Sequence, residues 1–423
     1  MESVGRFPAK SVQSLSKPLV ALSHTTNFAV QTNAVPMLVV HGYGKLVNAS
    51  SSLYSFMSVI SSSSQIIIQE LDPEDLKAWI KSQALALGFA DCVIARPDAQ
   101  AELARFKEYL KRGYHADMHY LEENLEKRAD PTLLVPGTKS IICVRMNYLV
   151  ASPKPRYVPF EPNSAIIARY ARGRDYHKVM RGRLKTLASR IKEKVGDFES
   201  RPFADSAPIF EKSLAESAGM GWTGKHTLLI HKKSGSFFVL GELFTSLDLP
   251  FDQPATAHCG SCTACIDICP TQAIVEPYML DARKCIAYLT IEYKGIIPEE
   301  LRSGIGNRIF GCDDCQLICP WNGFAKTASI PDFDPRHRLD DISLLEIWQW
   351  DEVTFLAKTE GSPIRRTGYQ SFKRNIAIGL GNAPYSAEII SQLHDAKMWH
   401  DEIVNVHIEW AIQQQLQQIS VPE

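Results

Sequence analysis

Eight of the ten cysteines in this 423-residue chain lie between positions 259 and 319. Four of them have the spacing C-x2-C-x2-C-x3-C, with Pro270 next; they are Cys259, Cys262, Cys265 and Cys269. Three thiolates on such a tight loop reach three irons of one cubane, and the fourth usually binds a second cluster. The spacing therefore predicts [4Fe–4S] chemistry and a redox protein.

The second cysteine group is incomplete. Cys312, Cys315 and Cys319 have the spacing C-x2-C-x3-C, and Pro320 follows them. Cys285, which lies 27 residues before Cys312, supplies the missing ligand, so the count is four plus four. Zinc ribbons instead pair C-x2-C units across a longer gap. Two [4Fe–4S] clusters are therefore the favoured interpretation, and zinc is the alternative.

The other two cysteines and the composition describe an ordinary globular chain. Cys92 and Cys143 lie in or beside apolar stretches and are expected to pack as small apolar side chains. Apolar residues make up 45%, charged residues 22%, and the net charge is −1, so bulk charge indicates no polyanionic partner. No apolar run reaches the roughly 18 residues of a membrane span. Clustered cysteines without a disulfide pattern favour a reducing, cytoplasmic location.

Helices and strands alternate irregularly before the cysteines. Asp72 as N-cap and Pro73 as first residue predict a helix to about position 87. A helix containing Leu103, Phe106 and Leu110, strands at 91–95, 140–149 and 237–240, and a helix at 181–195 follow. The fold class predicted is α+β, with an α+β or α/β domain over residues 66–252.

The cysteine module is assigned to residues 253–330 and a helical region to 331–423. Trp348, Trp350, Phe355 and Ile376 are the expected core of that last region. Residues 1–65 differ, because the first 64 hold fourteen serines and one acidic residue, Glu2. A transit peptide is serine-rich and acid-poor, but a disordered extension, or a start codon chosen upstream of Met57, is the favoured interpretation.

Two glycine patterns near position 220 look like nucleotide sites. Gly219, Gly221 and Gly224 match G-x-G-x-x-G, but the residues before them are predicted helical, whereas a dinucleotide site needs a strand there. Gly219 to Lys225 also spells G-x-x-x-x-G-K, but His226 replaces the required Ser or Thr. A loop whose backbone closely approaches another part of the molecule is the favoured interpretation.

The segment Asp175-Tyr176-His177 begins like the corrinoid motif D-x-H-x-x-G, in which the histidine binds cobalt. Met180 stands where the motif needs glycine. We therefore predict that His177 is a surface or contact histidine and not a cobalt ligand.

Ten basic residues between positions 169 and 194 are opposed only by Asp175 and Glu193. They are Arg169, Arg172, Arg174, Lys178, Arg181, Arg183, Lys185, Arg190, Lys192 and Lys194. A phosphate-binding face and a solvated helix face explain this stretch equally well. Arg365, Arg366, Lys373 and Arg374 form a second basic group in the helical region.

Several stretches together resemble the epoxyqueuosine reductase family. They are Gly113-Tyr114-His115, Glu126-Lys127-Arg128, Asn147-Tyr148, residues 170–177, Asp205-Ser206-Ala207-Pro208, Gly219–His226, both cysteine groups with Pro320-Trp321-Asn322, residues 364–369 and residues 407–411. The resemblance covers roughly residues 66–416. It implies a cytoplasmic monomer that reduces epoxyqueuosine to queuosine at the tRNA wobble position.

The resemblance also implies the cofactors and partners. Base-off cobalamin is expected between the α/β domain and a ferredoxin-like two-cluster module, without a protein ligand to cobalt. A HEAT-like helical tail is expected to bind the tRNA, and an unidentified low-potential donor is expected to supply electrons through the clusters.

Site residues are carried over by matching position. The expected cobalamin contacts are Arg128, Asp205, Leu229, Leu240, Ala287, Cys312 and Asp313. One cluster is expected on Cys259, Cys262, Cys265 and Cys319, the other on Cys269, Cys285, Cys312 and Cys315. Lys294 matches a tRNA contact, and Arg172, Arg174, Arg365 and Arg366 are further candidates.

Asp205 matches the proton donor of the family. An ordinary aspartate has a pKa of about 3.9, so donation near pH 7 requires a pKa raised by about three units. A turn or cap residue is the alternative for Asp205. For the whole chain, the alternatives are a corrinoid-dependent reductive dehalogenase and a simple iron–sulfur electron carrier.

Overall fold

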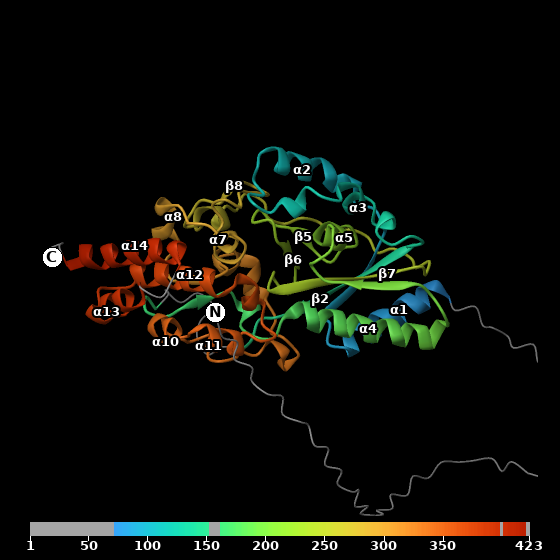
Figure 1. The fold of residues 1–423 in the computed structure, drawn as a ribbon. Coiled ribbons are helices and arrows are strands. Elements are labelled where there is room, and N and C mark those ends of the chain that lie inside the picture. Colours follow the sequence, from blue (N-terminus) through green and yellow to red (C-terminus); the bar gives the residue numbers. More distant parts are fainter. Residues whose placement is uncertain (1–71, 152–160, 398–400, 420–423) are drawn as a thin grey trace, which may run out of the picture. The chain divides into compact units, whose positions relative to one another are not determined.

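The computed structural model describes residues 72–151, 161–397 and 401–419. These residues belong to one compact unit, which spans Gln69–Glu423 (Figure 1). The predicted extension at residues 1–65 lies outside the described residues. Within the described residues, no helix is both long enough and apolar enough to cross a membrane.

A four-stranded sheet forms the centre of the first half, in the order β1-β2-β7-β4. Its strands are β1 (Asp91–Ala95), β2 (Ser140–Asn147), β7 (Phe238–Thr245) and β4 (Ser200–Phe203). Every neighbouring pair is antiparallel. The region is therefore α+β, which is one of the two predicted classes, and the α/β alternative is wrong because α/β domains are built on parallel strands joined by crossover helices.

Helices cover both faces of this sheet, which explains the apolar run at 140–149. The helices α1 (Pro73–Ala86) and α4 (Tyr176–Val195) pack on one face, and α5 (Glu211–Ser217) packs on the other (Figure 1). All eight residues of β2 are buried as a result. Cys92 and Cys143 lie fully inside, which confirms that they are packing residues.

The first residues of the long helices are set by capping side chains. The Asp72 carboxylate accepts hydrogen bonds from the N–H groups of Glu74 and Asp75, as the sequence predicts. The next long helix, α4, starts five residues before its predicted position of 181. Its start is fixed by Asp175, whose side chain accepts from the N–H of His177.

The remaining elements before the C-terminal helices are short. They are α2 (Gln100–Lys111), α3 (Leu125–Ala129), β3 (Ile166–Ile167), β5 (Trp222–Thr223), β6 (Leu229–Ile230), α6 (Ala264–Asp267), β8 (Ile274–Glu276), β9 (Met279–Leu280), α7 (Ile286–Ile291), α8 (Glu299–Ile305), β10 (Arg308–Phe310) and α9 (Asp314–Leu317), with 3-10 helices at His119–Leu121, Pro131–Leu133, Arg169–Ala171, Pro320–Phe324, Pro331–Phe333 and Pro363–Thr367.

The C-terminal part is helical, as predicted. It contains α10 (Leu344–Trp348), α11 (Glu352–Lys358), α12 (Tyr369–Asn382), α13 (Ala387–Ala396) and α14 (Glu402–Ile419). Trp348, Trp350, Phe355 and Ile376 are all buried there. The same core includes residues of α7 and β10. The cysteine module and the helical region are therefore packed as one body, although they were predicted as separate segments.

Two members of the second basic group are structural and do not face solvent. Lys373 is buried and donates to the carbonyl of Trp348. Arg374 is fully buried and donates to the carbonyls of Leu289, Tyr293 and Gly295. The hydrogen bonds of Arg374 tie α12 to the segment that follows Cys285. The predicted basic group therefore reduces to Arg365 and Arg366 on this surface.

We expect His407 to make the helical region sensitive to acid. It is fully buried, its Nε2 accepts from the N–H of Ile297, and its Nδ1 donates to the carbonyl of Ile403. Burial lowers the pKa of His407 to about 4, from an ordinary value near 6.5. The unfolded chain therefore binds the proton first, so stability present above pH 6.5 is lost as the pH falls toward 4, by about 1 kcal/mol at pH 5.5.

The measurement is the midpoint of thermal unfolding between pH 7.5 and 5.5. His407→Gln keeps an acceptor and a donor but does not titrate, so its midpoint should fall less over this range than that of the wild type. Equal pH dependence in the two proteins would contradict the assignment.

Candidate functional site

Four cysteines from the two groups line one cavity of about 320 Å³: Cys259, Cys262, Cys265 and Cys319. Cys259 and Cys262 lie in the loop that leads into α6, Cys265 lies on α6 itself, and Cys319 follows α9. The short helices α6 and α9 pack against each other, which brings the loop and Cys319 together. This is the grouping that the family resemblance implied for one cluster.

The other four cysteines also lie close together. Burial, followed by the charges of Cys285 and Asp313, raises the pKa of Cys315 well above that of a free thiol, and Cys265 and Cys269 add to this effect. Burial raises the pKa of Cys312, and the charge of Cys315 adds to this effect. Cys285 stands at the start of α7 and thus reaches the second group from a different element. Its predicted role as the completing ligand agrees with this placement.

The glycine-rich loop supports the first cysteine group and has no strand before it. It follows α5, a helix, as the sequence analysis expected. A Cβ at Gly219 would lie 2.2 Å from the carbonyl oxygen of Gln253, so the loop makes the close backbone approach that was predicted. The Lys225 ammonium donates to the carbonyls of Gly260 and Cys262 at 2.8 and 2.9 Å. Lys225 therefore holds the cysteine loop.

A chain of three titratable side chains joins the start of α4 to the loop between β4 and α5. Nδ1 of His177 is 2.7 Å from Asp175 Oδ1, and its Nε2 is 2.9 Å from Asp205 Oδ2. His177 is 3% exposed, whereas the side chain of Asp205 is 54% exposed. Both ring nitrogens are thus engaged by carboxylates. His177 is a contact histidine, which is one of the two predicted placements, and it is not on the surface.

The proton of this chain resides on the imidazole. Burial would lower the pKa of His177, but its hydrogen bonds to Asp175 and Asp205 outweigh that effect and raise it. Although the Asp205 side chain is half exposed, desolvation by the groups packed around it would raise its pKa, but the hydrogen bond and charge of His177, with the charge of Arg366, hold the pKa below its ordinary value. The upward shift that proton donation by Asp205 requires stays a prediction, and the partner His177 was not foreseen.

Two further carboxyl groups lie behind Asp205. Its backbone has φ of +60°, a left-handed conformation that costs free energy for a non-glycine residue. The N–H of Asp205 donates to Glu211 Oε1 at 2.5 Å, which holds the loop in this conformation. Burial and then the charge of Asp205 raise the pKa of Glu211 to about 7. Burial and the charge of Glu211 keep the fully buried Glu242 neutral, with its pKa well above the ordinary value.

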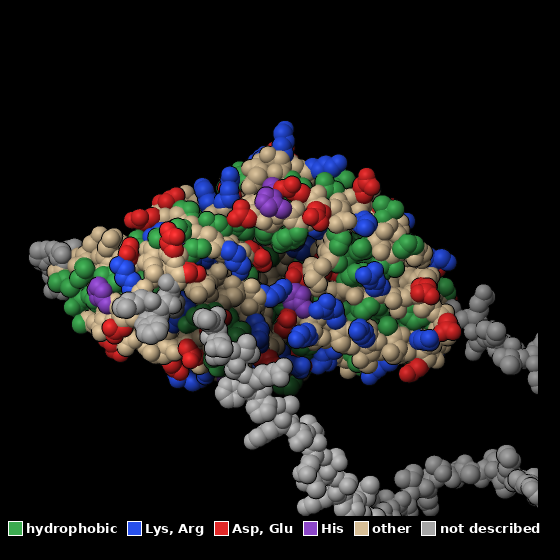
Figure 2. All heavy atoms as spheres, viewed as in Figure 1, with side chains coloured by type: hydrophobic (Ala, Val, Ile, Leu, Met, Phe, Trp, Pro, Cys, Tyr) green, Lys and Arg blue, Asp and Glu red, His purple; other side chains and the backbone are tan. Residues whose placement is uncertain are grey.

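Aromatic and charged groups that the sequence analysis did not single out surround Asp205. Burial, followed by the charges of Glu292 and Asp205, raises the pKa of Tyr120, whose ring is about half exposed. The ring of Tyr170 contacts that of Tyr176, whose centroid is 3.9 Å from the His177 ring, and the preceding Arg169 donates its N–H to Asp313. Tyr170 therefore connects the acid chain to Asp313, which follows Cys312. Figure 2 shows that this face is hollowed near its centre, with charged side chains around the hollow. Spacing alone gave no indication of Tyr120, Glu211 or Glu242.

Two family models match the chain: "4Fe-4S double cluster binding domain" over residues 258–322 and "Epoxyqueuosine reductase QueG, DUF1730" over residues 128–206. The epoxyqueuosine reductase of Pseudomonas aeruginosa is 50% identical over 343 residues, which cover 81% of this chain and 95% of that protein. The chain belongs to the epoxyqueuosine reductase family. The Escherichia coli epoxyqueuosine reductase is 48% identical over 82% of this chain and 92% of its own length.

Solved structures of epoxyqueuosine reductases have the same fold. The enzyme from Streptococcus thermophilus matches with a TM-score of 0.74 at 27% identity, over 82% of this chain and 91% of that one. An epoxyqueuosine reductase solved with a tRNA-Tyr epoxyqueuosine-modified stem loop matches with a TM-score of 0.71 at 27% identity, over 82% of this chain and all of that one. A Bacillus subtilis structure, with a TM-score of 0.67 at 26% identity over 81% of this chain and all of that one, has its catalytic loop swung out of the active site.

The residues matched to cobalamin contacts of epoxyqueuosine reductases come from both halves of the described chain. Leu229 on β6 is buried, Leu240 on β7 and Ala287 on α7 are partly buried, and Asp313 is buried beside Arg169, whose N–H donates to it at 2.9 Å. Arg128 is buried and donates to the carbonyls of Tyr120 and Glu123.

The candidate tRNA contacts differ in their surroundings. Arg365 and Arg366 are exposed, and the guanidinium of Arg366 lies 3.4 Å from His177 Nδ1. Lys294 donates to the carbonyls of Ile291 and Thr367, which places it beside Arg366. Arg174 is exposed and paired with Asp332. Arg172 is different, because it is partly buried and donates to the carbonyl of Ile167.

The rest of the basic stretch divides into two kinds of residue. Lys178, Arg181, Lys185, Lys192 and Lys194 are exposed, and Figure 2 shows blue side chains gathered over α4. Arg183 and Arg190 instead bond to Asp332 and Gln83 and so join α4 to its neighbours. Arg183 and Arg190 therefore fit neither interpretation of the stretch, and for the exposed residues the phosphate-binding face stays a prediction.

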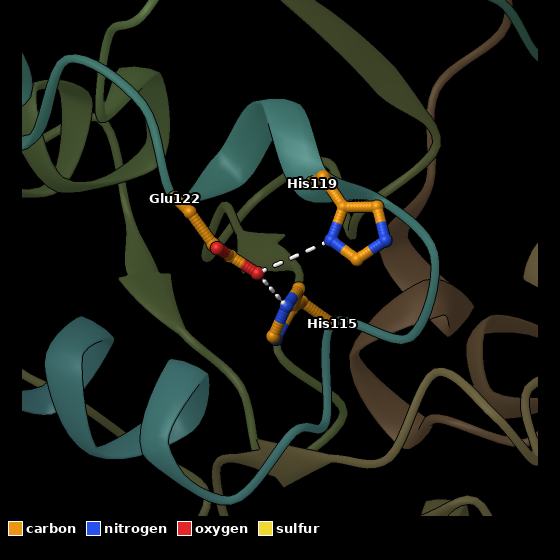
Figure 3. A group of neighbouring side chains, drawn as sticks. All are labelled: His115, His119 and Glu122. Carbon is orange, nitrogen blue, oxygen red and sulfur yellow. Dashed lines mark hydrogen bonds and ion pairs between the residues drawn. The ribbon is translucent and has the colours of Figure 1, made fainter.

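Figure 3 shows a second group of possible metal ligands, formed by His115, His119 and Glu122. Glu122 Oε1 lies 2.6 Å from His115 Nε2 and 3.3 Å from His119 Nδ1, which are direct hydrogen-bonding distances. Nδ1 of His115 is buried and has no partner among the described residues, whereas a metal-bound histidine normally donates from its other nitrogen. The geometry therefore favours an ion-pair group that closes this turn.

Proposed function

We propose that the protein reduces epoxyqueuosine to queuosine at the wobble position of tRNA, using cobalamin and two [4Fe–4S] clusters. The observation that carries this proposal is the link from Asp313 to His177: the N–H of Arg169 donates to Asp313, and the ring of the next residue, Tyr170, contacts Tyr176, which packs on His177. It brings a proton-holding chain and the second cysteine group to the same place. The ferredoxin-like module would then be residues 253–330, and the HEAT-like region would be the helices after residue 331.

The reaction requires two electrons and two protons, because opening the epoxide to the alkene releases its oxygen as water. A low-potential donor supplies the electrons, and Cys259, Cys262, Cys265 and Cys319 hold the first cluster. Cys269, Cys285, Cys312 and Cys315 hold the second. When cobalamin is bound, its cobalt supplies the redox chemistry at the substrate carbon. Leu229, Leu240, Ala287 and Asp313 line its place, with Arg128 at the edge.

The protein's own acid is the His177–Asp205 pair. His177 stores the proton at Nε2, and the exposed Asp205 carboxylate relays it to the oxygen that leaves the substrate. Asp175 holds the imidazole from the opposite side and fixes its orientation. Glu211 keeps the Asp205 loop in place, which is relevant because the corresponding enzyme of Bacillus subtilis has a catalytic loop that swings out.

We expect Arg365 to contribute to tRNA binding through a phosphate contact. Arg365→Ala should weaken binding of an epoxyqueuosine-bearing stem loop several-fold, and should reduce the dependence of log affinity on log salt by about one unit, because one fewer counterion is released. Lys192→Ala is the control. Lys192 is also exposed and basic, but it lies near the C-terminal end of α4, whereas His177 lies at the N-terminal end of that helix. Equal effects of the two substitutions would argue for unspecific attraction.

The test of the proposed function is conversion of epoxyqueuosine-bearing tRNA by the anaerobically reconstituted protein with cobalamin and a reductant. Digestion and mass spectrometry of the nucleosides should show queuosine. Binding without conversion, with clusters and cobalamin present, would overturn it.

A further inference from the structure

His226 is held rigidly in the wall of the first cysteine cavity. A tight turn contains it, in which the N–H of Thr227 donates to the carbonyl of Gly224 and the N–H of Gly224 donates to the carbonyl of Leu228, both at 2.8 Å. A Cβ on Gly224 would lie 2.9 Å from the imidazole Cε1, so the ring lies directly against the backbone. Only glycine leaves room for this ring position.

The hydrogen bonds of the ring define its tautomer. Nδ1 of His226 accepts from the N–H of Leu228 at 3.2 Å, so the hydrogen of the neutral ring is on Nε2. That nitrogen is buried and has no hydrogen-bond partner among the described residues. The side chain is 3% exposed. An unsatisfied buried donor is destabilising, so a partner is expected.

The imidazole of His226 belongs to the wall of a cavity that four cysteines share. His226 lines the same cavity of about 320 Å³ as Cys259, Cys262, Cys265 and Cys319. A cluster held by these cysteines carries sulfur atoms with negative charge, and sulfur accepts hydrogen bonds. Hydrogen bonds to the sulfurs are among the features that set cluster potentials.

We propose that His226 Nε2 donates a hydrogen bond to a sulfur of the cluster held by Cys259, Cys262, Cys265 and Cys319, and thereby raises its reduction potential. Reduction adds one negative charge to the cluster, and an N–H donor stabilises the more negative state. The proposal rests on the proposed function only in assigning a cluster to this cavity.

Pulsed EPR on the reduced wild-type holoprotein tests the contact without any substitution. Protein grown with 15N-histidine should show coupling of a cluster to one histidine nitrogen and to a proton that exchanges in D2O. Absence of both couplings, with about eight irons per chain, would overturn the proposal.

Two variants test the effect on potential. His226→Phe keeps the ring but lacks the donor, and His226→Gln keeps an N–H donor. In a redox titration followed by EPR, His226→Phe should make one cluster about tenfold harder to reduce, which is ~59 mV for one electron, and His226→Gln should lie nearer the wild type. An unchanged potential in His226→Phe would overturn the proposal.

These outcomes are separate from those that test the proposed function. A protein with normal iron content and the histidine coupling, but no conversion of epoxyqueuosine-bearing tRNA, would support the role of His226 and overturn the proposed reaction. Conversion of the tRNA by a protein that lacks the histidine coupling would support the proposed reaction and overturn the role of His226.

Discussion

Asp205→Asn should lower turnover by about 100- to 10 000-fold, the range typical of a lost general acid. The amide does not relay the proton that His177 holds, and it removes one of the two carboxylates that keep the imidazole charged. The measurement is single-turnover conversion of epoxyqueuosine-bearing tRNA. Iron content and the EPR signal of bound cobalamin should match the wild type, since the exposed Asp205 side chain carries no core packing.

Ser206→Ala is the matched control, because Ser206 is also exposed and lies on the same loop. Its turnover should stay within a few-fold of the wild type. A comparable loss in both variants would indicate that the loop conformation, and not the Asp205 carboxylate, limits the reaction. A near-normal rate for Asp205→Asn would remove the proton relay from the mechanism.

Cys285→Ala should abolish turnover by removing the cluster nearest to Asp313. Cys285 reaches the second cysteine group from α7, and with three remaining thiolates the cubane loses a ligand. Iron content should fall from about eight to about four atoms per chain. Turnover should become undetectable, because electrons no longer pass from the first cluster.

Cys92→Ala serves as its control. Cys92 is buried in the sheet and packs as a small apolar side chain, so iron content and turnover should be retained. Full iron content in Cys285→Ala would show that the second group binds its cluster without this residue, and it would favour a ligand outside the predicted set.

Local sequence rules predicted the elements whose cause is local. Asp72 and Pro73 fixed the start of α1, and the apolar run at 140–149 corresponded to a strand covered on both faces. The cysteine spacings predicted two groups of four, and one group indeed lines a single cavity. In each case the decisive interactions join residues that are close in sequence or share an unmistakable ligand chemistry.

The predictions were incomplete where the cause is a distant partner. For Asp205 the sequence indicated only burial as an influence on the pKa, but His177 lies 28 residues earlier and supplies a hydrogen bond that lowers it. Lys373 and Arg374 belong to the second basic group of the sequence, but they donate hydrogen bonds to carbonyls inside the core. Composition cannot distinguish a basic side chain that faces solvent from one that satisfies buried carbonyls.

The family resemblance supplied what spacing could not. Leu229, Leu240 and Ala287 have no chemistry that would mark them as cofactor contacts, and they are found only by matching position. Conversely, the resemblance gave no role to His226 or Glu211. The role of His226 depends on its unpartnered Nε2, and that of Glu211 on the hydrogen bond that it accepts from the N–H of Asp205. Only the structure shows these two features.

The most direct test of the account is the conversion reaction with all components defined. Full-length protein with about eight irons per chain and bound cobalamin, both confirmed spectroscopically, is incubated anaerobically with a low-potential reductant and tRNA that carries epoxyqueuosine. The account predicts stoichiometric appearance of queuosine in the digested tRNA, and none when cobalamin is omitted. Unchanged epoxyqueuosine in the complete reaction, or equal conversion without cobalamin, would contradict it.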